Sequence, residues 1–123
     1  MAFVLKQSAT YIWPITLVLP VDGGKRQKHT FDGELRRLPQ SRISEIIKLA
    51  QLQERGALAD DEELRDQDAA KEVLVGWANI VDDEGEDVPF SDSKLNELLE
   101  IPTVAGQIVR AWFDSLEVAK QKN

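Results

Sequence analysis

Residues 11–21 read YIWPITLVLPV, and every second position from Trp13 to Val21 is apolar. This two-residue period predicts a β-strand whose alternate side chains face a core. Pro14 and Pro20 cannot donate the backbone hydrogen bonds that a strand inside a sheet requires. We therefore expect either a strand at the edge of its sheet or a short strand.

The residues that follow the strand predict a β-hairpin. The sequence DGGK at residues 22–25 is a turn signal, because glycine adopts positive φ without steric cost. The return segment places His29, Phe31 and Leu35 on one side. A lone hairpin is marginal in water, so its apolar face must pack on helices or on another copy of the chain.

Helical periodicity begins after the hairpin. Apolar residues recur at spacings of three and four, first from Ile43 to Ala50 and later from Ala70 to Val81 and from Ala105 to Leu116. Helices are predicted over residues of about 39–55, 61–81, 92–99 and 102–119, with Gly56 ending the first and Pro102 beginning the last.

These elements predict an α+β fold in which an N-terminal β-hairpin is followed by about four α-helices, so that the chain is mainly helical. The expected organisation is a flexible N-terminal arm over residues 1–10, a single domain over residues 11–119 with its hairpin at 11–37, and a frayed tail at 120–123.

Charge is unevenly distributed along the chain. The net charge is −7, and residues 60–100 carry fifteen acidic but three basic side chains. An acidic protein repels phosphate backbones, so we expect no nucleic-acid partner. The segregation is typical of a solvated acidic face, and it also fits head-to-tail contact between copies. The chain has no cysteine, no signal-peptide pattern and no run of about 20 apolar residues, which indicates an intracellular protein without membrane contact.

The acidic loop WANIVDDEGEDVPFSD, residues 77–92, could be a calcium loop, a catalytic acid cluster or a connector. A calcium loop with Gly85 at its sixth position would place Ile80 and Ser91 at its first and last ligand positions, and neither residue type fits there. The carboxylates are crowded, and no apolar neighbour would raise one pKa selectively. We interpret the loop as a connector that Gly85 turns and that Val88 and Phe90 hold to the core.

No catalytic or cofactor-binding residue is indicated elsewhere. His29 is the single histidine, and a zinc site without cysteine would need several carboxylates. Neither a serine-nucleophile motif nor a phosphate-binding glycine loop is present. We therefore expect no enzyme activity, no metal and no cofactor.

The order of several short motifs resembles the tail assembly chaperones of long-tailed, lambdoid-type bacteriophages (siphophages). The resemblance covers nearly the whole chain. It rests on Trp13-Pro14, Gly23-Gly24, Phe31, Arg37-Leu38, Gly76-Trp77, Gly85, Pro89-Phe90-Ser91 and the closing segment IVRAWFDSL.

This resemblance implies a protein of phage or prophage origin that acts in the host bacterial cytoplasm. It would bind the tape measure protein, keep it soluble until tail tube protein polymerises around it, and be absent from the mature virion. Partners implied in this way are the tape measure protein, the tail tube protein, further copies of the chain, and a longer form made by ribosomal frameshifting near Gln121-Lys122-Asn123.

Two other functions remain open at this point. One is a small structural virion protein, such as a tail or head-joining component, and the other is a regulatory or anti-host binding module. For a binding function, the candidate interface residues are the apolar N-terminal residues, the strand tryptophan and the adjacent aromatics of the last helix. They are Phe3, Val4, Leu5, Trp13, Trp112 and Phe113.

Overall fold

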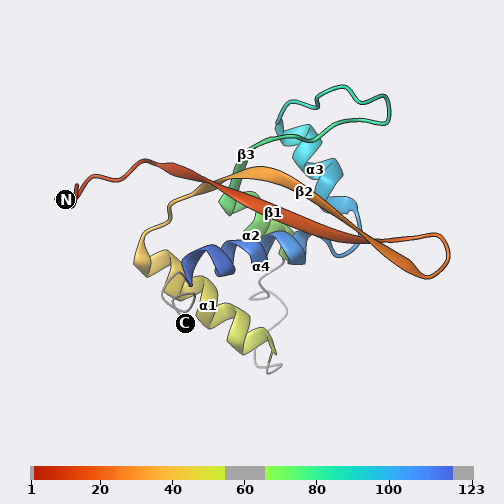
Figure 1. The fold of residues 1–123 in the computed structure, drawn as a ribbon. Helices are drawn as coiled ribbons and strands as arrows, with labels where there is room; N and C mark the ends of the chain where they lie inside the picture. Colours follow the sequence, from red (N-terminus) through yellow and green to blue (C-terminus); the bar gives the residue numbers. More distant parts are fainter. Residues whose placement is uncertain (1, 55–65, 118–123) are drawn as a thin grey trace.

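The computed structural model describes residues 2–54 and 66–117 of the chain. Strands β1 (Thr10–Val21) and β2 (Lys25–Arg36) form a long antiparallel hairpin, in which Val21 pairs with Lys25. Gly23 and Gly24 have φ values of 84° and 73°, so the predicted glycine turn is confirmed. A third strand, β3 (Leu74–Ala78), pairs with β2 to give the order β1-β2-β3 (Figure 1).

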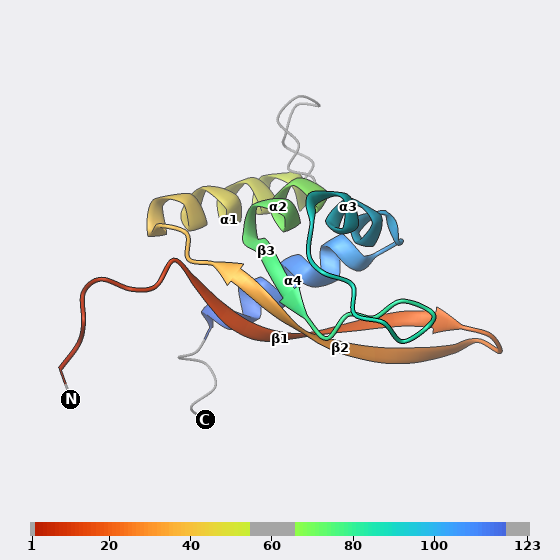
Figure 2. The ribbon, with the colours of Figure 1, turned by 90° about the horizontal axis from the view of Figure 1, so that it is seen from above.

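Four helices lie in the described part of the chain, on one side of the sheet (Figure 2). They are α1 (Gln40–Glu54), α2 (Asp66–Val73), α3 (Asp92–Glu100) and α4 (Val104–Leu116). None of these helices is long and apolar enough to span a membrane. The described residues therefore form two layers, with none of their helices on the opposite face of the sheet.

The prediction of a mainly helical chain with a hairpin as its sole β-structure is wrong, because the sheet has three strands. The error lies in the helix predicted over residues 61–81. Its described part is helical to Val73 and then becomes β3, and residues 61–65 lie outside the described residues.

The local sequence explains this change from helix to strand. Val73 and Val75 are β-branched, and Gly76 costs about 1 kcal/mol in a helix interior. The free edge of β2 offers hydrogen bonds instead, pairing Glu34 with Gly76 and Asp32 with Ala78. Periodicity could not detect this competition, because the apolar residues from 70 to 81 also satisfy a helical spacing.

The other predicted helices are present with small shifts in their ends. Helix α4 begins at Val104 because Thr103 adopts φ 71° and acts as the N-cap, so Pro102 precedes the helix. Residues 118 and 119 of the predicted last helix, and the predicted tail, lie outside the described residues.

The core fills the space between the sheet and the helices. Alternate side chains of β1 and β2 enter it, including Ile15 and Leu35, both at 0 % exposure. They meet buried residues of the four helices and of β3, which are Ile46, Ala69, Ala70, Val73, Leu74, Leu95, Leu99, Val104, Ala105, Ile108, Val109 and Trp112.

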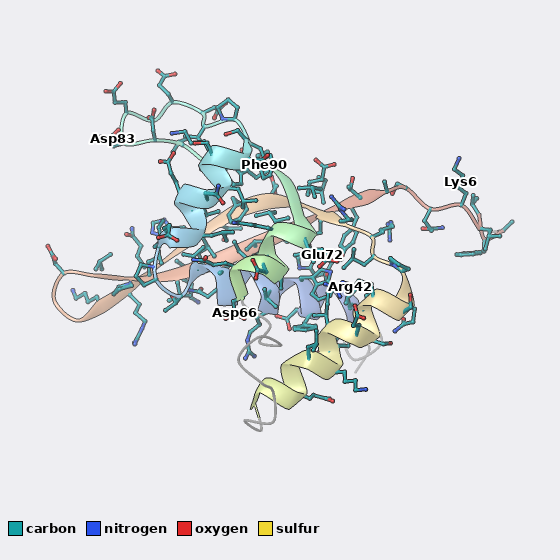
Figure 3. All side chains as sticks on the ribbon, turned by 180° about the vertical axis from the view of Figure 1, so that it is seen from behind. Lys6, Arg42, Asp66, Glu72, Asp83 and Phe90 are labelled. Atoms are coloured by element: carbon teal, nitrogen blue, oxygen red, sulfur yellow. The ribbon has the colours of Figure 1, made fainter. Side chains whose placement is uncertain are left out.

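Helix α1 is held to this core by one buried side chain and one ion pair. Ile46 is fully buried. Arg42 donates two hydrogen bonds to the carboxylate of Glu72 on α2, at 2.8 and 2.7 Å, and also contacts Glu45 (Figure 3). The Arg42 guanidinium lowers the pKa of Glu72 because it stabilises the ionised carboxylate.

Gly33 occupies the centre of the sheet, where a side chain would collide with the core. It pairs with Trp13 on one side and Trp77 on the other. A Cβ atom at Gly33 would lie 2.5 Å from Cδ1 of Ile15 and 3.2 Å from Cδ1 of Leu74. Because Gly33 has no side chain, the Ile15 side chain can lie across β2 toward β3. It fills the part of the core next to Trp13 and Trp77.

Replacing Gly33 by alanine should therefore lower the free energy of unfolding by about 1–3 kcal/mol, the usual cost of overpacking a core. Gly76→Ala is the comparison, because its new methyl group would meet the Glu34 side chain, at 2.5 Å from Oε1 and 3.2 Å from Cβ, instead of the apolar core. Urea unfolding monitored by tryptophan fluorescence would measure both. Equal stability of the two variants would contradict the role assigned to Gly33.

Candidate functional site

Helix α4 is bonded to the outer edge of β1 by one side-chain amide. The Val18 N–H donates to Oε1 of Gln107 at 2.7 Å, and Nε2 of Gln107 donates to the Val18 carbonyl at 3.0 Å. Nε2 also contacts Oγ1 of Thr103 at 3.0 Å. The Gln107 amide thus replaces the peptide group that a neighbouring strand would supply.

A second contact fixes the other end of α4 to β1. The hydroxyl groups of Tyr11 and Ser115 lie 2.7 Å apart, and Ser115 Oγ donates to the Trp112 carbonyl at 2.6 Å. Because the single Ser115 proton is used in that bond, the Tyr11 hydroxyl is the donor to Ser115. Helix α4 therefore runs antiparallel to β1 between two polar contacts.

A groove of about 1030 Å³ lies between β1 and α4. We call it the β1–α4 groove. Trp13, Pro14 and Thr16 line it from the strand, and residues from Thr103 to Glu117 line it from the helix and its caps. Trp13 and Phe113 are half-buried, so each presents part of its ring to solvent. The groove thus offers aromatic surface in a concave setting.

The β1 edge beside this groove is partly protected. Alternate residues of a strand direct their backbone groups to the same edge. Val18 directs its N–H and carbonyl outward to Gln107, so the backbone groups of Ile12, Pro14, Thr16 and Pro20 also face outward. Pro14 and Pro20 have no N–H to offer. Among the described residues, the amides of Ile12 and Thr16 and the carbonyls of Ile12, Pro14 and Thr16 remain as an open segment from Ile12 to Thr16, which could accept a further strand.

The polar lining of the β1–α4 groove is mixed in charge. Of the described residues, Asp66, Asp114 and Glu117 line it together with one cation, Arg110. Among the described residues, no cluster of three or more His, Asp or Glu side chains could hold a metal ion. The arrangement is suited to binding apolar and weakly basic groups.

The structure separates the predicted interface residues into three groups. Phe3, Val4 and Leu5 are 77, 68 and 87 % exposed on an arm that leaves the domain (Figure 1). Trp13 and Phe113 are brought together in the β1–α4 groove. Trp112, by contrast, is 1 % exposed and packs in the core, with its ring 4.9 Å from that of Phe113. Of the two adjacent aromatics of α4, Phe113 is the one available to a partner.

A smaller hollow continues from the groove past Trp13. It has a volume of about 500 Å³ and is lined by Tyr11, Leu38 and Leu116 among others. Because Trp13 lines both spaces, it lies between two adjacent hollows. An elongated ligand could therefore contact both sides of this tryptophan.

The acidic loop is organised as a turn. Oδ1 of Asp82 accepts hydrogen bonds from the N–H groups of Glu84 and Glu86 at 2.8 and 3.0 Å, and Gly85 adopts φ 80°. Trp77 donates to the Val88 carbonyl at 2.7 Å and meets Phe90 edge to face. The Asp82 carboxylate is thus used by the turn itself, as expected of a connector.

Gln107 is the functional residue that sequence reasoning missed. It lies in the segment VAGQIV, where the neighbouring residues are apolar and most are buried. A polar residue in such a position needs a hydrogen-bonding partner. That signal was present, but its partner lies 89 positions away in the chain.

Comparison of the chain with protein-family models, with curated proteins and with solved structures found no match.

Replacing Gln107 by leucine should leave the Val18 N–H and carbonyl unpaired and lower the free energy of unfolding by about 1–3 kcal/mol. The Val18 amide should then exchange its hydrogen faster, as measured by NMR. Gln107→Glu separates the two bonds: its carboxylate still accepts from the Val18 N–H, but its second oxygen faces the Val18 carbonyl and cannot donate to it, so protection of the amide should fall between that of the native and leucine chains. Equal exchange of Val18 in the native and leucine chains would contradict the assignment.

Proposed function

We propose that this protein is a tail assembly chaperone of a long-tailed bacteriophage. It would bind apolar segments of the tape measure protein in the host bacterial cytoplasm and be displaced before the virion is complete. The observation that carries the proposal is the β1–α4 groove, in which Trp13 and Phe113 lie beside an open strand edge. The order of the sequence motifs is the reason for proposing this family. The groove offers a surface to which the client could bind.

The groove has the features that an apolar client segment requires. An amphipathic helix presents side chains at spacings of three and four residues, and such side chains fit a concave aromatic surface. Trp13 separates the groove from the second hollow, so that successive apolar side chains could lie on its two sides. Large aromatic residues contribute much of the binding energy at interfaces of this kind.

Charge outside the groove would keep the complex in solution. The chain has a net charge of −7, and the exposed loop over residues 82–87 carries five carboxylates. Segments of the client that are coated by acidic copies would repel one another, and this repulsion would oppose aggregation. Weak binding at each copy would still hold the coat in place, because many contacts act along one long client. Growing tail tube could then remove the copies one at a time.

Thr16 and Thr30 offer a matched pair of positions to test this site. Their hydroxyl groups bond to each other at 2.9 Å on the exposed face, but Thr16 lines the groove and Thr30 lies on β2 outside it. Replacing either by arginine removes the same hydrogen bond and adds the same charge. Thr16→Arg alone places that bulk at the groove.

The experiment is co-expression with the tape measure gene of the same genome. The native chain and Thr30→Arg should keep the tape measure protein soluble, whereas Thr16→Arg should leave most of it in the pellet. Thermal unfolding should be similar for the two variants. Equal solubilisation by both would contradict the groove as the client site. Recovery of the chain in purified virions would instead favour a structural tail or head-joining protein.

A further inference from the structure

The N-terminal arm, residues 2–9, exposes three consecutive apolar side chains. Phe3, Val4 and Leu5 are each more than two-thirds exposed, whereas most large apolar residues of the domain are buried or half-buried. The arm carries one cation, Lys6, and no acidic residue. Such a segment in an acidic chain fits a partner surface that is apolar and has negative charge at its rim.

The arm is directed away from the groove of its own chain. The Ala9 carbonyl accepts from the Arg37 N–H at 2.9 Å, and Ser8 Oγ contacts the Thr10 carbonyl at 2.8 Å, so this end of the arm is held in line with β1. Beyond it the arm leaves the body of the domain, with Lys6 far from Asp66 at the groove (Figure 3). The arm is therefore placed to reach a second copy rather than the groove of its own chain.

The arm and the groove are complementary in three respects. In an extended conformation Phe3 and Leu5 point to the same side, where the groove presents Trp13 and Phe113. The arm backbone can bond to the open segment of β1 from Ile12 to Thr16. The positive charge of Lys6 suits a groove whose described lining has more carboxylates than cations.

We propose that the N-terminal arm of one copy docks in the β1–α4 groove of a second copy, adding as an extended strand beside β1. The contact is head-to-tail, because each copy offers an arm at one end and a groove elsewhere, so it can repeat along a row of copies. The arm occupies the site proposed for the client, and binding of the client would release it. The docking itself depends on the groove alone, whatever the identity of the client.

Complementation between two full-length variants tests this docking. Phe3→Ser/Leu5→Ser removes the arm's apolar side chains and keeps the groove, while Thr16→Arg blocks the groove and keeps the arm. In sedimentation velocity over about a hundredfold range of concentration, the native chain and Thr30→Arg should form growing oligomers, and each of the other two variants alone should stay monomeric. Their mixture should form a one-to-one dimer that grows no further.

The outcomes that overturn the proposal are distinct. A native chain that is monomeric throughout would show that the arm folds back or stays free. Oligomers that persist in the arm variant would point to contact between charged surfaces instead. Dissociation of the oligomers by added salt to the same extent in every variant would point to the same contact. A mixture without dimers would also exclude the docking. Tape measure solubilisation by the arm variant, whose groove is intact, separates failure of this proposal from failure of the client site.

Discussion

The pair of hydrogen bonds between Gln107 and Val18 is the constraint on which the rest of the site depends. It fixes α4 against the edge of β1 and satisfies the two backbone groups that would otherwise attract another strand. Pro14 and Pro20 remove two further donors from the same edge. The protection stops short of the segment from Ile12 to Thr16, and the β1–α4 groove lies beside that segment. The contacts that protect part of the β1 edge thus also determine which part of it a partner can bind.

The interior explains why this edge strand is firmly placed. Gly33 allows Ile15 to lie across β2, and the two tryptophans that flank the glycine lie on the same side of the sheet. Trp77 is fixed by its bond to the Val88 carbonyl and by its contact with Phe90. Trp13, on the edge strand, keeps part of its ring at the surface. Trp77 also lies on an edge strand, but the loop residues Val88 and Phe90 lie against it, whereas Trp13 lines the groove.

Much of the sheet could be predicted from the sequence, and the reasons for the failures are physical. The two-residue period and the prolines of residues 11–21 gave the hairpin and its edge position. The strand β3 was missed because its apolar residues also fit a helix, and pairing with β2 decided between the two. The sequence made both adjacent aromatics, Trp112 and Phe113, candidate interface residues, but packing buries Trp112 and leaves Phe113 at the groove. Contact between Gln107 and Val18 joins distant segments, which local patterns do not reveal.

Amide hydrogen exchange of β1 tests the central claim most directly, because the claim concerns specific backbone groups. In dilute protein, the amides of Ile12 and Thr16 should exchange faster than those of Ile15 and Leu17, which face β2. In a soluble complex with the tape measure protein, Ile12 and Thr16 should become protected while the loop over residues 82–87 stays unchanged. Protection confined to that loop, or no change along β1, would contradict the open edge and its groove as the binding surface.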